Sequence, residues 1–374
     1  MKVYLDNGAT TRVDDKVVEQ MGVYFRENYG NASSLHSFGV ETKKALERAR
    51  DIIARKINAD VEQIIFTSGG SESNNLAIKG VANKCKKGHF ITSKIEHSSV
   101  LETFRALEND GFSVTYLNVD RNGFVDIRQL EKSIGKDTLL VSIMHANNEI
   151  GVIQDIKKIG NICKKYRILF HTDAVQSFCK VNLDVKDANV DFVSLSAHKI
   201  HGPKGIGALF IKDRSKIRKE IFGGDQEFNL RAGTENVASA VGFAKAIELI
   251  KDGDLKRMKI LRDKLIEGIL KIPNTKLNGD LNNRLVNNVN ICFNGIEGES
   301  LLLRLDDRGI AVSTGSACGS KKLGMSHVLL GIGLNKEETH GSLRFTLSKY
   351  TTKEDIDYTL KVLKEEVEKL RRVS

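Results

Sequence analysis

The chain has 374 residues, 40% of them hydrophobic and 28% charged, with a formal net charge of +10 at pH 7. These values exclude a disordered chain and predict a globular protein large enough for about two domains. No apolar stretch approaches the ~20 residues that span a bilayer, and the first residues lack the apolar region of a signal peptide. We therefore expect a cytoplasmic protein.

The basic residues lie scattered beside acidic ones, and the chain has no tryptophan. Because no basic run with interleaved aromatic residues occurs, binding to nucleic acid is not expected, and an acidic protein partner is the better match to the charge. The five cysteines are an odd number and form no Cys-x-x-Cys pair. That pattern excludes a disulfide framework and a zinc ribbon, and it leaves room for one reactive thiol.

Short β-branched runs alternate with longer helical patterns over the first two thirds of the chain. The runs predict strands at residues 63–66, 89–92, 113–117, 139–144, 168–171, 190–195 and 206–211. The helical patterns between them cover residues 71–85, 98–110, 127–134 and 156–166. This alternation predicts repeated βαβ units, and hence an α/β domain with a mostly parallel, seven-stranded sheet.

The pattern changes near residue 250. Helices are predicted at residues 238–250, 254–270, 298–308 and 353–370, with short strands at 289–293 and 343–347. This second set predicts a smaller α+β domain. We place the large domain at residues 15–255 and the small domain at residues 1–14 and 256–374.

A stretch rich in Ser and Gly, residues 67–73, follows the first strand of the α/β region and opens a helix. Exposed backbone N–H groups and the helix dipole favour an anion there, and glycines such as Gly70 let the backbone approach it closely. Ser71 is in the same turn. The stretch is not a Walker loop, because no Gly-Lys-Ser/Thr follows. Ordinary helix capping by serine is the alternative interpretation.

Asp173 stands at the end of a predicted buried strand, where a carboxylate is costly unless it is paired. The N–H of a pyridinium ring is such a partner, and Gln176 could donate to a phenolic oxygen on the same ring. His97 also follows a strand and could stack on a flat ring or exchange protons near neutral pH. Helix capping is the alternative for both Asp173 and His97.

Ser196-Ala197-His198-Lys199 emerges from an apolar run between groups able to hold a phosphate. This layout is typical of a lysine that forms a Schiff base with pyridoxal phosphate. The alternative is a solvated loop lysine, which is the usual fate of lysine, but the preceding apolar run argues against it. Lys204, inside Gly-Pro-Lys-Gly, is the rival and is more typical of a turn.

Two further residues complete the candidate site. Cys318 lies among small, flexible residues, which suit an exposed and mobile thiol, whereas Cys292 lies in a predicted buried strand. Arg344 lies in a predicted strand of alternating character, where its guanidinium could hold a substrate carboxylate through two hydrogen bonds. A surface strand arginine is the alternative.

Together and in this order, these motifs resemble the cysteine desulfurases of the NifS/IscS type, which are fold-type I pyridoxal-phosphate enzymes. The similarity runs nearly from end to end, through residues 4–11, 66–77, 96–97, 145–151, 173–176, 196–207, 231–234, 316–318 and 344–345. Two departures are minor: Ala32 stands where the family usually has proline, and Asn7-Gly8 varies the opening motif. The chain also ends at Ser374, short of the C-terminal extension of many IscS-type members.

The resemblance implies catalytic roles for Lys199, which would carry the cofactor, for His97, which would stack on its ring, and for Cys318, the nucleophile. It implies further cofactor contacts from Gly70, Ser71, Asn148, Asp173, Gln176, Ser196, Ala197, His198 and Thr234. Arg344 and Asn148 would bind the substrate. Thr234 would reach the phosphate of the other subunit, which implies a homodimer.

The implied reaction removes sulfur from L-cysteine, releases L-alanine and leaves a persulfide on Cys318. The sulfur would pass to an acceptor such as an IscU-like iron–sulfur scaffold protein, and Cys318 would also be a ligand of a transient [2Fe–2S] cluster shared with that scaffold. The loop around Cys318 resembles the longer, mobile loop of the first desulfurase group.

Three other functions stay open at this point. One is selenocysteine lyase. A second is an aminotransferase, which needs no mobile thiol. The third is a non-catalytic assembly partner, against which the intact Lys199 and Cys318 argue.

Overall fold

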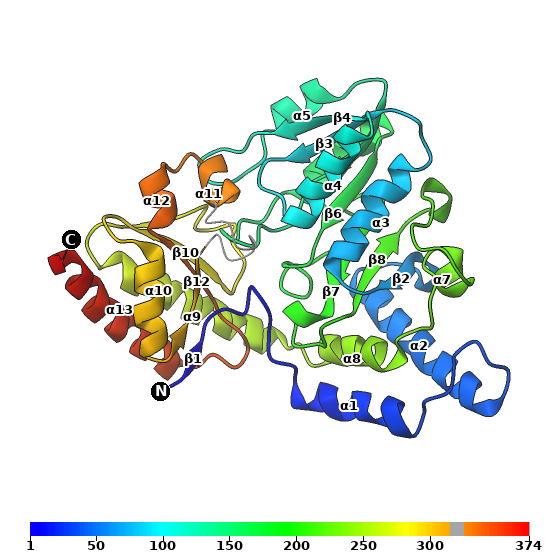
Figure 1. Ribbon diagram of the computed structural model, residues 1–374, viewed down its shortest axis with the longest axis horizontal. Coiled ribbons are helices and arrows are strands. Elements are labelled where there is room, and N and C mark those ends of the chain that lie inside the picture. The colour runs from blue at the N-terminus through cyan, green and yellow to red at the C-terminus, as the bar shows by residue number, and fades with distance from the viewer. Residues whose placement is uncertain (315–324, 374) are drawn as a thin grey trace.

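The computed structural model describes residues 1–314 and 325–373, so Cys318 lies outside the described residues. Figure 1 shows a larger body built on a seven-stranded sheet and a smaller body built on a four-stranded sheet, with the N-terminal segment running between them. No helix in the described ranges is both long and apolar enough to cross a membrane.

The larger sheet confirms the predicted mostly parallel arrangement. Its strands are β2 (Ile64–Thr67), β3 (His89–Ser93), β4 (Ser113–Leu117), β5 (Thr138–Ser142), β6 (Leu169–Asp173), β7 (Phe192–Ser196) and β8 (Gly207–Ile211). Their spatial order is β2-β8-β7-β6-β5-β3-β4. Only β8 runs antiparallel to its neighbours, β2 and β7. All seven strands were predicted from the sequence, with ends that differ by a residue or two, because hydrogen bonding and not hydrophobicity sets where a strand stops.

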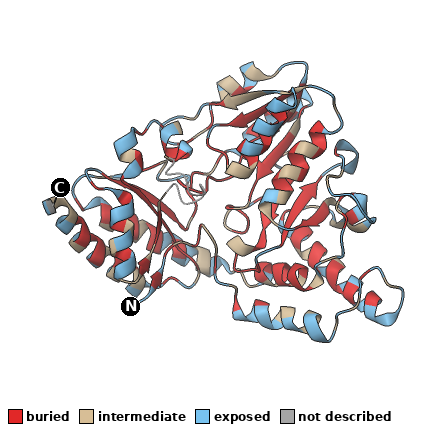
Figure 2. Ribbon diagram, in the orientation of Figure 1, coloured by how far each residue is buried: buried red, intermediate tan, exposed pale blue. Residues whose placement is uncertain are grey.

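Helices cover both faces of this sheet. One face carries α2 (Ser37–Lys56), α6 (Ile156–Tyr166) and α8 (Val237–Glu248), and the other carries α3 (Gly70–Ala82) and α4 (Ser98–Asn109). Successive strand residues point to opposite faces, so Ile64 and Ile91 join the first core, whereas Ile65 and Phe90 join the second. Figure 2 shows the central strands of this sheet buried, because both faces are covered, whereas the edge strand β4 is mostly half-buried.

The smaller sheet is antiparallel. It consists of β9 (Thr275–Leu277), β10 (Asn288–Phe293), β12 (Ser313–Thr314) and β13 (Ser342–Thr346) in the order β12-β13-β10-β9. Helices α9 (Asp252–Leu270), α10 (Gly298–Asp307) and α13 (Lys353–Val373) pack with it around a separate core. The N-terminal Val3 and Leu5 belong to that core, and β1 (Val3–Tyr4) pairs in parallel with β11 (Ile310–Ala311).

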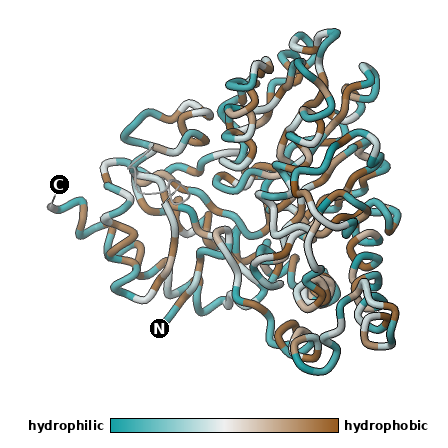
Figure 3. The backbone as a smooth tube through the Cα atoms, turned by 45° about the vertical axis from the view of Figure 1, so that its right-hand side comes forward, coloured by the Kyte–Doolittle hydropathy of each residue, from teal (hydrophilic) through white to brown (hydrophobic). Residues whose placement is uncertain are grey.

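The remaining helices are short or peripheral: α1 (Asp15–Arg26), α5 (Ile127–Ser133), α7 (Gln226–Asn229), α11 (His327–Gly331) and α12 (Lys336–His340). Of all the helices, α1, α2, α7, α11 and α12 were not predicted, nor were the strands β1, β9, β11 and β12. Most of these are too short to give a periodic pattern. Figure 3 shows hydrophobic and hydrophilic positions alternating along the longer helices, which is the signal that made the others predictable.

Candidate active site

Several of the predicted site residues lie at one edge of the seven-stranded sheet. Strands β6 and β7 are adjacent and parallel, with Asp173 paired to Ser194. Asp173 ends β6, and Ser196 ends β7 three residues before Lys199. Because parallel strands end at the same edge, the carboxylate and the lysine are brought together there.

The Lys199 amine is held by backbone carbonyl groups from the N-terminal segment. Its Nζ donates hydrogen bonds to the carbonyl oxygens of Gly8 at 2.6 Å and Ala9 at 2.7 Å. The Gln176 side chain donates to the same Gly8 oxygen at 3.0 Å. Lys199 is half-buried, so the interpretation as a solvated loop lysine is wrong, whereas the rival Lys204 is exposed in a turn.

A hydrogen-bonded chain of side chains connects Asp173 to His97. Asn74 Nδ2 donates to Asp173 Oδ2 at 2.7 Å and to Ser99 Oγ at 2.9 Å. Ser99 Oγ in turn lies 2.8 Å from His97 Nδ1. The second carboxylate oxygen, Asp173 Oδ1, accepts from the backbone N–H of Val175 at 2.9 Å. The buried carboxylate therefore has partners on both oxygens, and Asn74 is a site residue that the sequence did not reveal.

His97 caps helix α4, as the alternative interpretation held, and still faces the site. The Ser99 N–H donates to His97 Nδ1 at 3.1 Å, so a neutral ring carries its proton on Nε2. Burial lowers the pKa of His97, the charge of Lys199 lowers it further, and Asp173 opposes both. The imidazole is therefore neutral near pH 7 and offers an N–H donor.

The first turn of α3 has the features of an anion site. The helix begins at Gly70 with no side-chain cap, which leaves its first N–H groups without a side-chain acceptor. A Cβ on Gly70 would lie 2.5 Å from a methyl carbon of Val175, so this close approach requires glycine. Nearby, Gly207 pairs with both Thr67 and Ser196 in the sheet, which places the ends of β2 and β7 at the same edge.

Ser196 contributes a buried hydroxyl that has no hydrogen-bond partner among the described residues. A buried polar atom of this kind is costly unless a ligand satisfies it. Ala197 is fully buried and offers no polar side-chain group. His198 Nδ1 lies 3.2 Å from Thr10 Oγ1, and burial, followed by the charges of nearby lysines, lowers its pKa to about 4.

Thr234 does not line the pocket that Lys199 lines. It is exposed and lines a pocket of about 240 Å³ together with Ser68 and Arg231. Arg231 Nε donates to Glu72 Oε1 at 2.9 Å, which ties the Thr234 segment to the first turn of α3.

Arg344 reaches the site from β13, in the smaller sheet. It is only 2% exposed, so the interpretation as a surface arginine is wrong. Its Nη1 donates to the Asn148 carbonyl oxygen at 2.9 Å, and its Nη2 donates to Asp6 Oδ1 at 2.9 Å. The Arg344 Nε and the Asn148 Oδ1 are buried and have no hydrogen-bond partner among the described residues. A carboxylate and an amine, the two polar ends of an amino acid, would satisfy both.

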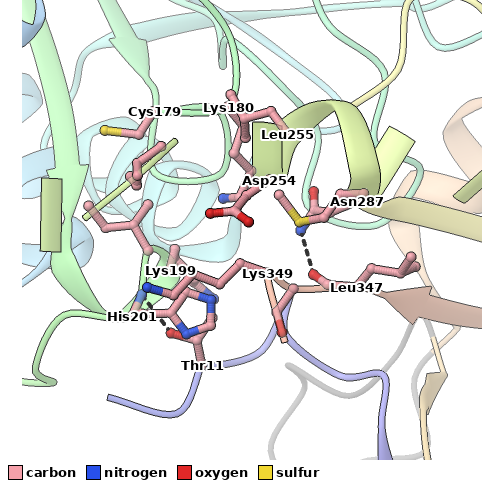
Figure 4. Close-up of a pocket in the computed structure, with 14 residues that line it drawn as sticks. Thr11, Cys179, Lys180, Lys199, His201, Asp254, Leu255, Asn287, Leu347 and Lys349 are labelled. Atoms are coloured by element: carbon pink, nitrogen blue, oxygen red, sulfur yellow. Dashed lines mark hydrogen bonds between the residues drawn. The ribbon is translucent and has the colours of Figure 1, made fainter. Parts of the chain in front are cut away.

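Lys199 also lines a pocket of about 40 Å³ with Lys180, His201 and Lys349, as Figure 4 shows. His97, Asp173 and Arg344 do not line this pocket. The Lys180 amine donates to the Gln176 carbonyl oxygen at 2.9 Å. Burial lowers the pKa of Lys180 to about 8, and the charge of Lys199 acts in the same direction. Lys180 is thus a second buried amine beside the site, which the sequence analysis missed.

Two buried carboxyl groups, Glu96 and Glu149, lie next to the predicted residues His97 and Asn148. Burial raises the pKa of Glu96 to about 8 and that of Glu149 to about 7. Glu149 Oε2 accepts a hydrogen bond from the Ser326 hydroxyl, which also caps α11. Neither carboxyl was predicted, because nothing in the local sequence shows that these acids are buried.

The proposed nucleophile and cluster ligand Cys318 lies outside the described residues. The other four cysteines are free thiols, and Cys292 is buried, as predicted, with its pKa raised by burial to about 11. Within residues 1–314 and 325–373, no group of three or more His, Cys, Asp or Glu side chains could hold a metal ion.

The residues that the sequence analysis missed are mostly supporting ones. Asn74 lies four residues after Gly70, so the two share a face of α3, and this spacing was the available signal. Asp6, Gly8, Ala9 and Thr10 belong to an opening motif that was recognised only as a resemblance. Their contacts with the site depend on how the N-terminus crosses the molecule, which no local pattern indicates.

Comparison with known proteins gives a consistent result. The family model for class-V aminotransferases matches residues 3–359. A protein named cysteine desulfurase IscS from Dictyoglomus turgidum is 53% identical over 379 residues, covering 100% of this chain and 96% of the relative. Another of the same name, from Methanosarcina thermophila, is 52% identical and covers 100% of this chain and 93% of the relative.

Solved structures agree. A NifS-like protein has a TM-score of 0.93 at 41% identity, covering 99% of this chain and 100% of its own. A structure described as SspA in complex with cysteine has a TM-score of 0.85 at 39% identity, with 94% and 100% covered. The resemblance seen in the sequence is therefore confirmed: the chain belongs to the class-V aminotransferase family and, within it, to the cysteine desulfurases of the IscS type.

Proposed function

We propose that this protein is a pyridoxal-phosphate-dependent cysteine desulfurase. L-cysteine and the Cys318 thiol would give L-alanine and a persulfide on Cys318. The observation that carries the proposal is the joint placement of Lys199, Asp173 and the uncapped start of α3 at one sheet edge, with the unpaired Nε of Arg344 facing the same site region from β13.

The side chains present fit pyridoxal phosphate. The phosphate would take the N–H groups of Gly70 and Ser71 and the unpartnered Ser196 hydroxyl, with His198 beside them. The buried Asp173 carboxylate suits a protonated ring nitrogen, and Asn74 and Val175 keep it oriented. Gln176 and Asn148 would contact the ring oxygen and the substrate.

The bound cofactor would supply an electron sink at the substrate α-carbon. The residues of the chain would do the rest. Lys199 would hold the cofactor, and its amine would move the substrate α-proton. The neutral His97 would hold a proton on Nε2. Arg344 and Asn148 would orient the amino acid, and the Cys318 thiolate would attack its sulfur.

A homodimer is part of the proposal. Thr234 is exposed and does not line the pocket that Lys199 lines, which fits a role in the site of a second copy. Exposed apolar side chains on α1, α2 and the segment between them, including Phe25, Tyr29, Phe38 and the 96% exposed Leu35, favour a protein contact.

Four further predictions are kept as proposals. The division into domains at residues 15–255 and at 1–14 with 256–374 is supported by the two separate cores. An IscU-like scaffold would accept the sulfur, and the basic net charge of +10 fits an acidic partner. A transient [2Fe–2S] cluster with Cys318 as a ligand, and a cytoplasmic location, rest on the family resemblance and the sequence alone.

The deciding experiment measures alanine and sulfide release from L-cysteine in the presence of a reductant. We expect yellow protein that releases both products in equal amounts. Cys318→Ser should lose sulfide release and keep the yellow colour, whereas Lys199→Ala should lose both. Full sulfide release by Cys318→Ser would refute the nucleophile, and full release by a colourless Lys199→Ala would refute the cofactor assignment. Exclusive activity on selenocysteine would favour a lyase.

A further inference from the structure

Arg344 is held in place by two acceptors from different parts of the chain. One is the carbonyl oxygen of Asn148, and the other is the carboxylate of Asp6, each 2.9 Å away. A guanidinium has five N–H donors in a fixed plane, so two hydrogen bonds to different Nη atoms set the orientation of the whole group. Under that orientation the buried Nε–H has no partner among the described residues.

Asp6 is itself rigidly placed relative to Arg344. It forms a parallel bridge with Thr346, which lies two residues beyond Arg344 on β13 and therefore on the same face of that strand. Thr346 also accepts a hydrogen bond at its Oγ1 from the Gly8 N–H at 2.6 Å, and its N–H donates to the Leu5 carbonyl oxygen at 2.6 Å. The backbone on both sides of Asp6 is therefore anchored to the strand that carries the arginine.

The space beside this pair is tight. A Cβ added to Gly8 would lie 3.0 Å from Thr346 Cγ2 and 3.3 Å from Arg344 Cζ. The guanidinium therefore packs against the Gly8 backbone and has little freedom to tilt. The same short segment contacts Lys199 and Gln176 through the Gly8 carbonyl oxygen and His198 through Thr10. Figure 1 shows this N-terminal segment between the two bodies of the molecule.

We propose that Asp6 is a positioning residue for substrate recognition: it fixes the Arg344 guanidinium so that its Nε–H remains available for the carboxylate of the amino-acid substrate. This rests on the proposed function of Arg344. A purely structural ion pair would stabilise the fold without affecting substrate binding. A positioning carboxylate affects the KM for cysteine and leaves the chemistry at the cofactor, and hence kcat, nearly unchanged.

The test compares Asp6→Ala, Asp6→Asn and the control Asp15→Ala in the enzyme loaded with pyridoxal phosphate. Asp15 forms an exposed ion pair with Arg12 at 2.6 Å. The Asp15→Ala substitution therefore removes an Asp–Arg contact near the N-terminus without changing the site. Steady-state kinetics with L-cysteine give KM and kcat. The inhibition constant of 3-mercaptopropionate, which has the carboxylate and thiol but no amine, reports on the carboxylate contact without any contribution from the amine.

We expect Asp6→Ala to raise KM and this inhibition constant by about tenfold, with kcat within about twofold of the wild type. Asp6→Asn keeps an oxygen acceptor for Nη2 and should stay within about threefold. Asp15→Ala should match the wild type. If Asp6→Ala does not accumulate as folded protein, the nearly isosteric Asp6→Leu takes its place.

Three of the outcomes that would overturn the proposal are an unchanged KM in Asp6→Ala, a fall in kcat alone, and an Asp6→Asn variant as impaired as Asp6→Ala. A lower KM in Asp6→Ala would also overturn it, because Asp6 would then compete with the substrate. Arg344→Ala, measured in parallel, distinguishes a failure of the proposed role of Arg344 from a failure of the inference about Asp6. If Arg344→Ala leaves KM unchanged, the assigned role of Arg344 fails. If it raises KM and Asp6→Ala does not, only the inference about Asp6 fails.

Discussion

Two buried arginines, one in each body of the molecule, differ in how many of their N–H donors have hydrogen-bond partners. Arg50, on α2, donates from Nη1 and Nη2 to the two carboxylate oxygens of Glu227 at 2.7 and 2.9 Å, and Nη1 also donates to the Ile64 carbonyl oxygen at 2.6 Å. Arg344 has one carboxylate partner, Asp6, and an Nε with no partner among the described residues. A fully paired buried arginine holds a fold together, whereas one with a spare donor is suited to a ligand.

The Glu227 that pairs with Arg50 begins a segment with a strained backbone. Glu227, Phe228 and Asn229 have φ angles of 48°, 56° and 62°, in the left-handed region that costs about 1–3 kcal/mol for a non-glycine residue. Glu227 is fixed by Arg50 and also accepts from the Phe66 N–H at 2.8 Å, and the Arg50 guanidinium lies 5.2 Å from the Phe228 ring centre. The segment leads to Arg231 and Thr234, so this brace positions residues near the proposed phosphate site.

The largest expected effect is on Arg50. Arg50→Ala leaves the Glu227 carboxylate, 4% exposed in its side chain, buried without its cationic partner. Breaking a buried pair in this way costs about 3–5 kcal/mol, so we expect a loss of that order in the free energy of unfolding, measured by urea denaturation. Arg48→Ala, which removes only an exposed contact with Glu41 at 3.8 Å, is the control. A loss under about 1 kcal/mol for Arg50→Ala would show that the brace does not stabilise the fold.

The next effect concerns Glu149, a buried carboxyl near Arg344 that lacks the full pairing of Glu227. Burial raises its pKa from 4.5 to about 7, while the Ser326 hydroxyl and Arg344 oppose the rise. The folded state thus binds the Glu149 proton more tightly than the unfolded state. The protonated carboxyl therefore contributes its full stabilisation to the folded state below pH 4.5, and this stabilisation is lost as pH rises through 7. The loss is on the order of 3 kcal/mol.

Glu149→Gln removes this titration. Denaturation at pH 5 and pH 8 should show the variant gaining stability relative to the wild type at the higher pH. Glu96 is present in both proteins, so its own titration cancels in the difference. An equal difference at the two pH values would contradict the raised pKa of Glu149.

Arg344→Lys tests the second arginine of the comparison, the one with a spare N–H donor. Lysine keeps the charge but has no planar fork, so we expect the KM for L-cysteine to rise about 10- to 100-fold, while the free energy of unfolding changes by less than about 1 kcal/mol. Steady-state kinetics and urea denaturation check the two parts. A wild-type KM in this variant would mean that the Arg344 Nε–H does not bind the substrate carboxylate.

The smallest effect is expected for an exposed ion pair. Lys157 and Asp187 lie 2.6 Å apart with more than half of each side chain exposed. Lys157→Ala should leave the free energy of unfolding almost unchanged, because solvent and salt screen the pair. A loss comparable to that of Arg50→Ala would remove the distinction between buried and exposed pairs on which the other predictions rest.

The large sheet was predictable because its strands are buried on both faces and appear as apolar runs separated by helical periods. The predicted residues Asp173, Ser196 and Lys199 were found because each directly follows such a run. Asn74 was missed because its spacing from Gly70 is a weak signal until the helix is placed over Asp173. Short elements such as β1 and β12 were missed because two residues carry no periodicity.

The sequence by itself determined the fold class and the family, and it predicted residues for the site, because strand ends and ordered motifs are local features. Only the tertiary structure decided what surrounds those residues: that Lys199 is held by Gly8 and Ala9, that Arg344 pairs with Asp6, and that Glu149 is buried. The Lys199 and Arg344 contacts join residues about 190 and 340 positions apart. Burial and hydrogen-bond partners over such separations depend on how the chain packs, and no local run of residues indicates that packing.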